Sequence, residues 1–227
     1  MSKIELKHID KFYGKNHVLK DLNLTIEDGD FMTLLGPSGC GKTTTLRVVS
    51  GLEKPQNGFI YMDGKEIVNA AEAYYAPPSQ RNLNLVFQSY ALWPHMTVFE
   101  NVSFGLKIKK IPSAEIEKMV ASALERMQIG QYAKRYPTEL SGGQQQRVAI
   151  ARAISTHPPI IMADEPTGAL DSRTGHEVLG FLQQLNKEGS TVILITHDNG
   201  IAATARRVVR IADGKIIEDH PQEVDWY

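Results

Sequence analysis

Apolar and polar residues alternate at the start of the chain. Single polar residues separate Ile4 from Leu6, and further along they separate Leu22, Leu24 and Ile26. A period of two is expected of strands that bury one face against a core. The chain is therefore predicted to begin with a β-rich subdomain.

The pattern changes over residues 31–35, an apolar run that leads into glycines and then into residues 42–50. It predicts a strand, a glycine-rich turn and a helix. Apolar residues recur at helical spacing over residues 114–127, which predicts a helix in the middle of the chain. The apolar runs 160–163 and 191–196 predict parallel strands, joined through a helical segment by a right-handed crossover. A buried parallel core is therefore expected.

Length and composition fit one large or two closely joined domains. With 227 residues and 42% hydrophobic content, the chain can bury a core without metal or disulfide staples. The sequence contains no internal repeat or long linker. Residues 70–79, which include two adjacent prolines, form the clearest exposed loop.

Charge and cysteine content narrow the function class. The formal net charge is −1, so no global basic field exists to hold nucleic acid. The only cysteine, Cys40, cannot form an internal disulfide, which suits a reducing compartment. No signal core follows the first residue, and no apolar run approaches the roughly 20 residues of a membrane helix. We expect a protein that is neither secreted nor membrane-spanning on its own.

A phosphate-binding loop stands between the predicted strand at 31–35 and the helix at 42–50. The loop matches the motif at every fixed position and reads Gly36-Pro37-Ser38-Gly39-Cys40-Gly41-Lys42-Thr43. Its glycines let several backbone N–H groups point inward, and the helix N-terminus adds partial positive charge. Lys42 is expected to reach the β- and γ-phosphates of a nucleotide, and the Thr43 hydroxyl to bind Mg²⁺. The alternative is a plain glycine-rich turn.

Two carboxylates, Asp164 and Glu165, end the predicted strand at 160–163. At the carboxyl edge of the sheet Asp164 would lie beside the Mg²⁺ site, and Glu165 would polarise an attacking water. Taken alone, paired acids at a strand end are more often a helix cap or a solvated turn. The phosphate-binding loop upstream favours the catalytic interpretation.

A third motif makes the sequence resemble one family. Residues 140–147, Leu-Ser-Gly-Gly-Gln-Gln-Gln-Arg, open a helix with a Ser-x-x-Gln capping box. Together with the phosphate-binding loop and the Asp-Glu strand, this octet resembles the signature of the ABC ATPase family. The resemblance covers nearly the whole chain. It implies an α/β P-loop NTPase of the ABC type over residues 1–227, with a mainly parallel core sheet, an antiparallel β subdomain, an inserted helical subdomain at about 89–157 and no C-terminal regulatory domain.

The resemblance also implies roles for individual residues. Tyr13 matches the aromatic residue that stacks on adenine, although it is also compatible with an ordinary surface aromatic. Gln88 matches the glutamine that contacts Mg²⁺ and the attacking water, and His197 matches the histidine that contacts the γ-phosphate. The implied ATP site also includes Thr44 and, contributed by a second subunit, Ser141, Gly142, Gly143 and Gln144. The loop Ala169-Leu170-Asp171 would cross the dimer interface.

The two halves of the sequence resemble different branches of this family. Residues 89–102 resemble importer ATPases for sugars, polyamines or metals, in the segment that receives a membrane subunit's coupling helix. Residues 164–172, with Thr-Gly-Ala at 167–169, resemble ATPases of macrolide export and lipoprotein release. An engineered chimera, a reconstructed ancestor and natural variation would each account for the mixture. Import is favoured because the coupling segment meets the membrane subunit.

The implied function is hydrolysis of ATP with Mg²⁺ to energise solute transport through separate permease subunits. The expected partners are a second ATPase subunit, identical or paralogous, the permease and, for an importer, a solute-binding protein, but no nucleic acid. The expected location is the cytoplasmic face of the membrane. An exporter or lipoprotein-release ATPase is the first alternative, and a soluble ABC ATPase in iron-sulfur assembly is the alternative from another class.

Overall fold

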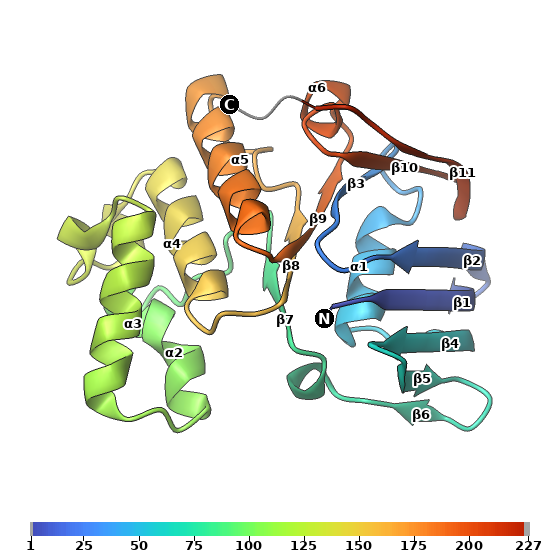
Figure 1. Cartoon of the computed structure of the whole chain (residues 1–227), viewed down its shortest axis with the longest axis horizontal. Coiled ribbons are helices and arrows are strands. Elements are labelled where there is room, and N and C mark those ends of the chain that lie inside the picture. Colours follow the sequence, from blue (N-terminus) through green and yellow to red (C-terminus); the bar gives the residue numbers. More distant parts are fainter. Residues whose placement is uncertain (1, 225–227) are drawn as a thin grey trace.

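Two β-sheets and a group of helices make up the structure (Figure 1), a computed structural model that describes residues 2–224. The ends of the predicted domain, residue 1 and residues 225–227, lie outside the described residues. One sheet has the strand order β2-β1-β4-β5-β6, and the other has the order β11-β10-β3-β9-β8-β7. The second sheet forms the core: the first sheet and the helix at 42–50 pack on one face, and the helices within residues 98–187 pack on the other.

The core sheet is parallel except at one edge. Its strands are β7 (Leu83–Val86), β8 (Ile160–Asp164), β9 (Thr191–Thr196), β3 (Phe31–Leu35), β10 (Arg207–Ala212) and β11 (Lys215–Pro221). Only β11 runs antiparallel to its neighbour, β10. The strands β3 and β9 are buried at every position, as expected of parallel strands covered on both faces. The parallel pairing predicted for 160–163 and 191–196 is confirmed, and helix α5 (Ser172–Lys187) connects the two strands.

Successive residues of the core strands point into two separate apolar cores. In β9, Val192 and Leu194 pack among the helices, whereas Ile193 and Ile195 pack toward the first sheet and helix α1 (Lys42–Ser50). This alternation follows from the two-residue period of a strand. A sheet covered in this way presents only its strand ends to solvent, so the strand ends position the site.

The first sheet is antiparallel and confirms the β-rich start of the chain. It contains β1 (Ile4–Tyr13), β2 (Asn16–Ile26), β4 (Asn57–Met62), β5 (Lys65–Asn69) and β6 (Tyr74–Tyr75). The predicted apolar positions of β1 and β2 are buried, and most residues between them are partly or fully exposed.

The prediction of an open loop over residues 70–79 is wrong in part. Tyr74 and Tyr75 form β6 and pair with β5, and Ala76 is buried. The cause lies in Arg81, whose buried guanidinium donates hydrogen bonds to the Ala76 carbonyl and to two carbonyls at the end of α1. Burial lowers the pKa of Arg81 to about 10. A cation at a helix C-terminus satisfies carbonyls that the helix itself leaves free.

The helices α2 (Val98–Ile108), α3 (Ser113–Arg126) and α4 (Gly142–Ile154) form a group beside β7 and β8 (Figure 1). Helix α3 confirms the helix predicted for 114–127, with bounds shifted by one residue. Single 3-10 turns at Pro78–Gln80, Gly130–Tyr132 and Pro137–Glu139 and the short helix α6 (Asn199–Ala202) complete the secondary structure. Within residues 2–224, no helix combines the length and apolarity that a bilayer crossing requires.

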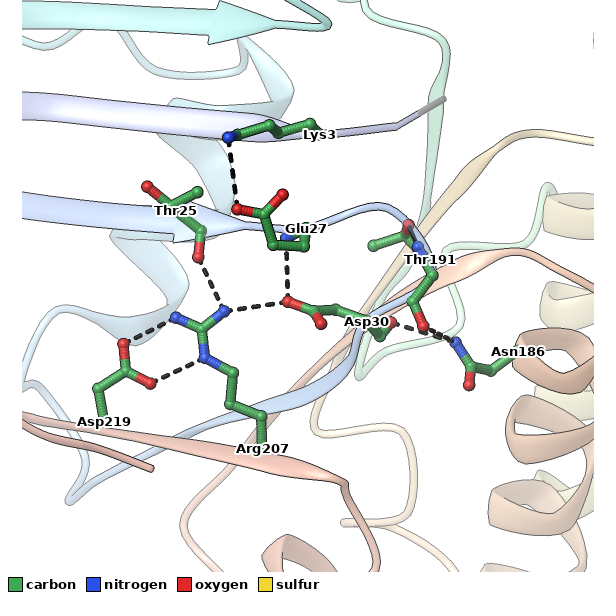
Figure 2. Close-up of polar contacts among 9 residues, drawn as sticks. Lys3, Thr25, Glu27, Asp30, Asn186, Thr191, Arg207 and Asp219 are labelled. Atoms are coloured by element: carbon green, nitrogen blue, oxygen red, sulfur yellow. Dashed lines mark hydrogen bonds and ion pairs between the residues drawn. The ribbon is translucent and has the colours of Figure 1, made fainter. Parts of the chain in front are cut away.

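Arg207 joins the two sheets (Figure 2). Its Nη1 donates to the Thr25 carbonyl at 2.8 Å and to an Asp30 carboxylate oxygen at 3.0 Å, and its other nitrogens form a bidentate pair with Asp219. The amide nitrogen of Asn186, from the end of α5, donates to the Asp30 carbonyl at 3.2 Å. Residues from β2, β10, β11 and α5 are thus tied to the turn that enters β3.

Candidate active site

The phosphate-binding loop connects β3 to α1 and is confined by its neighbours. A Cβ atom on Gly36 would lie 2.2 Å from the Ile211 carbonyl oxygen, so only glycine fits between the loop and β10. Gly41 has a φ of 113° and stands directly before α1, where it has no side chain to cap the helix. The backbone N–H groups of the first helical turn are therefore oriented to bind an anion.

Lys42 is folded back onto its own loop. Its Nζ donates to the Gly36 carbonyl at 2.6 Å and to the Pro37 carbonyl at 2.9 Å, and the side chain is buried. These carbonyls stabilise the ammonium charge. A phosphate would have to supply stronger acceptors, which its charged oxygens can do.

Thr43 and Asp164 lie together at the ends of α1 and β8. The Thr43 hydroxyl donates to an Asp164 carboxylate oxygen at 3.2 Å. Burial raises the pKa of Asp164, and the Thr43 hydrogen bond opposes that shift. A hydroxyl and a desolvated carboxylate at this spacing are oxygen donors of the kind that Mg²⁺ prefers, so these residues fit that cation.

Glu165 adopts an uncommon backbone conformation, with a φ of 48°. Its N–H donates to the Ile195 carbonyl at 2.9 Å, which holds the start of the loop against β9. Its Oε1 lies 2.9 Å from Nδ1 of His197. The Glu165 side chain is 14% exposed and the His197 side chain 62% exposed, so the pair stands at the mouth of the site.

Most residues predicted for the ATP site line one cavity of about 250 Å³. Its walls come from the phosphate-binding loop and from the carboxyl ends of β7, β8 and β9, where ligands bind in open α/β sheets. The lining residues are Ser38, Gly39, Gly41, Lys42, Thr43, Thr44, Gln88, Asp164, Glu165 and His197.

Four residues that were predicted to bind ATP within the same subunit do not line this cavity. Gly36 and Pro37 contribute the carbonyls that hold Lys42. Cys40 is 5% exposed, with its thiol packed against Gly36. Tyr13 is exposed at the end of β1, where Lys11 Nζ lies 4.8 Å from the centre of its ring. Its role in stacking on adenine stays a prediction.

The signature residues lie apart from this cavity. Ser141 caps α4 through the predicted capping box with Gln144. With Gly143 these residues line a separate hollow of about 240 Å³, whose walls include Tyr132, Arg147 and Thr174. Gly142 lies close to Tyr90: a Cβ atom on Gly142 would be 3.2 Å from the Tyr90 hydroxyl oxygen. One chain therefore does not bring its signature to its own phosphate-binding loop.

The predicted interface loop runs into α5. Ala169 is exposed and Leu170 is half-buried. Asp171 caps the helix by accepting hydrogen bonds from the Thr174 backbone N–H at 3.1 Å and hydroxyl at 2.7 Å. Within this chain Asp171 has a local structural role, and its contact with a second subunit stays a prediction.

Thr196 was missed by sequence reasoning. It ends β9 beside the loop after β8, and its hydroxyl lies 3.3 Å from a Glu165 carboxylate oxygen. The only signal in the sequence is a hydroxyl directly before His197 at a strand end. That signal is weak, because threonine is common in strands.

Comparison with known proteins identifies the family. The family model described as ABC transporter matches residues 19–168. The chain belongs to the ABC transporter family. The matched region runs from β2 through the phosphate-binding loop and the signature to the loop after β8.

Solved ABC structures confirm the predicted fold class. The dimeric structure of MJ0796, a bacterial ABC transporter cassette, has a TM-score of 0.86 and 38% sequence identity, over 97% of this chain and 99% of that one. A dimeric post-hydrolysis state of the same ATP-binding cassette, bound to ADP and phosphate, has a TM-score of 0.85 and 36% identity over the same shares. The chain thus has the P-loop architecture of an ABC cassette.

A curated ABC relative from Aggregatibacter actinomycetemcomitans bears the name spermidine/putrescine import ATP-binding protein PotA. It is 49% identical over 224 residues, which cover 97% of this chain. The PotA protein of Haemophilus influenzae is 48% identical over the same length. The chain spans 59% of the length of these curated relatives.

Proposed function

We propose that this chain binds ATP with Mg²⁺, hydrolyses it, and so energises solute transport through separate membrane subunits. One observation carries the proposal. A single cavity at the carboxyl ends of β7, β8 and β9 holds a phosphate-loop lysine, an oxygen donor pair suited to Mg²⁺, and a carboxylate hydrogen-bonded to a histidine. Phosphoryl transfer requires this combination of charge stabilisation and an oriented water.

Each residue has a defined part in the reaction. Lys42 and the loop N–H groups stabilise the phosphate charge, and His197 holds the γ-phosphate. Thr43, Gln88 and Asp164 would hold Mg²⁺, which offsets charge on the phosphate oxygens when bound. Glu165 orients water for in-line attack and accepts its proton, because neutral water is a poor nucleophile. Tyr13 would stack on the adenine ring.

The hydrolytic site is proposed to need two subunits. The signature and the phosphate-binding loop of this chain line separate hollows. In a dimer, Ser141, Gly142, Gly143 and Gln144 of one subunit would close over the nucleotide of the other. The dimeric MJ0796 structures support this arrangement, and the loop at 169–171 would lie between the subunits.

A groove on the helical side is proposed to receive the permease. It is a hollow of about 420 Å³, and its apolar lining includes Leu52, Leu85, Phe87 and Trp93. Arg152 stiffens it by donating to two backbone carbonyls of residues 90 and 91 and by placing its guanidinium 5.1 Å from the Trp93 ring centre. Phe87 lines this groove, and the next residue, Gln88, lines the ATP cavity. Closure of the cavity around a nucleotide can therefore be transmitted to the groove.

The direction of transport is proposed to be import, at the cytoplasmic face of the membrane. The support is the name of the curated relatives, which are spermidine/putrescine import ATP-binding proteins. The solute would be selected by the membrane and solute-binding subunits. Export and iron-sulfur assembly have no comparable support.

Steady-state ATPase activity with Mg²⁺ over rising protein concentration tests the proposal. Activity per molecule should rise with concentration, because the site forms between subunits. Glu165→Gln should abolish turnover while an ATP-bound dimer accumulates on size-exclusion chromatography. Activity per molecule that stays flat, with Glu165→Gln unaffected, would show that the composite-site mechanism is wrong.

A further inference from the structure

Thr196 lies between the strand that leads into the phosphate-binding loop and the strand that leads into Glu165. It is the last residue of β9, and its neighbours across the sheet are Leu35, which precedes the phosphate-binding loop, and β8, which ends in Asp164. Thr196 is 1% exposed. A buried hydroxyl is retained at low energetic cost only where its hydrogen bonds are satisfied.

The Thr196 hydroxyl accepts one hydrogen bond and donates another. Its oxygen accepts a hydrogen bond from the Asp198 backbone N–H at 3.1 Å. The hydroxyl proton is then free to donate, and it donates to Oε2 of Glu165 at 3.3 Å. A backbone N–H can only donate, so the Thr196 oxygen accepts from Asp198 and its own proton is available to the carboxylate.

Glu165 is thus held at both oxygens. Oε1 lies 2.9 Å from His197, which is largely exposed and is expected to turn toward phosphate when a nucleotide is bound. Oε2 contacts Thr196, which is buried in the sheet and has no such alternative. When His197 leaves, Thr196 is the contact that still fixes the carboxylate plane.

We propose that Thr196 is a positioning residue that orients the Glu165 carboxylate toward the attacking water through the relay from the Asp198 N–H. This inference rests on the proposed function, and it adds a residue that acts through Glu165. Loss of the hydroxyl leaves the carboxylate free to rotate, and misorientation of a catalytic group lowers the rate of the chemical step more than it weakens ground-state binding.

The test compares Thr196→Val, which removes the hydroxyl at nearly constant volume, with Thr196→Ser, which keeps it. For Thr196→Val we expect kcat to fall by about tenfold to a hundredfold, as for loss of other groups that orient a site residue, with KM changed by less than about twofold. Thr196→Ser should recover most of kcat. In Thr196→Val the ATP-bound dimer should accumulate, and the affinity for a fluorescent ATP analogue should stay unchanged.

Thr191→Val is the matched control. Thr191 is the first residue of the same strand, is equally buried, and uses its hydroxyl to accept the Gly29 N–H at 2.9 Å, at the end of β9 away from the site. Thr191→Val should lower the melting temperature without lowering kcat. If Thr196 had only a structural role, both valine variants would lower the melting temperature and neither would change kcat selectively.

The outcomes separate this inference from the proposed function. Unchanged kcat in Thr196→Val, in a protein that hydrolyses ATP and is inactivated by Glu165→Gln, would overturn the inference alone. The same holds if Thr196→Ser is as impaired as Thr196→Val. Absence of ATP hydrolysis in the wild-type dimer with its membrane partner would overturn the proposed function itself.

Discussion

The Nζ atom of Lys42 donates a hydrogen bond to the Gly36 carbonyl oxygen at 2.6 Å. The lysine expected to bind phosphate thus closes its own loop. The two partners stand at opposite ends of the loop, so this bond preserves the loop shape that a nucleotide would enter. We expect nucleotide binding to exchange this carbonyl for a phosphate oxygen.

Lys42→Met should therefore weaken nucleotide binding and also lower the stability of the protein without nucleotide. Methionine keeps much of the apolar stem but cannot donate to the two carbonyls, and we expect the free energy of unfolding to fall by about 1–3 kcal/mol. Urea denaturation without nucleotide measures this loss, and a fluorescent ATP analogue measures binding. Lys65→Met, at an exposed position of β5, is the control and should change neither. Equal stability of the two variants would contradict the role of Lys42 in holding the loop.

Two inactive variants should complement each other if the site is shared. Lys42→Ala damages the phosphate-binding loop, and Ser141→Arg blocks the signature that would close over a partner's nucleotide. A heterodimer of the two contains one intact site. If the sites act independently, an equal mixture should recover about one quarter of wild-type activity, because half the dimers are mixed and each has one of two sites. Full activity of Ser141→Arg by itself would contradict a composite site.

Arg207 should contribute more to stability than Arg210, three residues further along the same strand. Arg207 bonds the Thr25 carbonyl, Asp30 and Asp219, and the Asp219 hydrogen bond is the main cause of its raised pKa. Arg210 has an exposed pair with Glu218. Arg207→Met should lower the free energy of unfolding by about 2 kcal/mol, whereas Arg210→Met should lower it by less than about 1 kcal/mol. Equal urea unfolding midpoints for Arg207→Met and Arg210→Met would show that the contacts of Arg207 between the two sheets add no extra stability.

The ion pair between Glu53 and Lys11 should make stability depend on pH. The carboxylate lies 2.9 Å from a buried ammonium, and the hydrogen bond from Lys11 lowers the pKa of Glu53 below 4.5. The folded protein therefore binds this proton less readily than the unfolded chain does. The stabilisation is complete above the unfolded pKa and disappears as the pH falls through the lower folded value.

Denaturation of wild type and Glu53→Gln at several pH values measures this effect. The difference in free energy of unfolding should be largest above about pH 5 and should shrink below pH 4.5. Glu27→Gln, which removes an exposed pair with Lys3, is the control and should show a small difference throughout. A gap between wild type and Glu53→Gln that widens toward acid would contradict the assignment. Lys11 also lies against the Tyr13 ring, so Glu53→Gln should loosen the residue expected to stack on adenine.

Local patterns predicted the elements that carry strong periodicity. The strand at 31–35 and the helix at 42–50 have the predicted bounds, because glycines mark both ends of the loop between them. The sequence also indicates the phosphate-binding loop and the acids at 164 and 165, since the chemistry proposed for them depends on residue type at fixed spacing. The local pattern at 70–79 does not predict its structure, because the segment is held by Arg81, whose partners at the end of α1 lie 32 and 33 residues away in the chain.

The sequence by itself determined the P-loop class, the parallel core strands and most residues of the candidate ATP site, because spacing and residue type within short segments dictate them. Tertiary structure alone decided which groups face one another. It separated the signature from the phosphate-binding loop, buried Cys40, and placed Thr196 beside Glu165. Such relationships depend on the order of strands in the sheet. That order is set by packing among residues far apart in the chain, which no local pattern records.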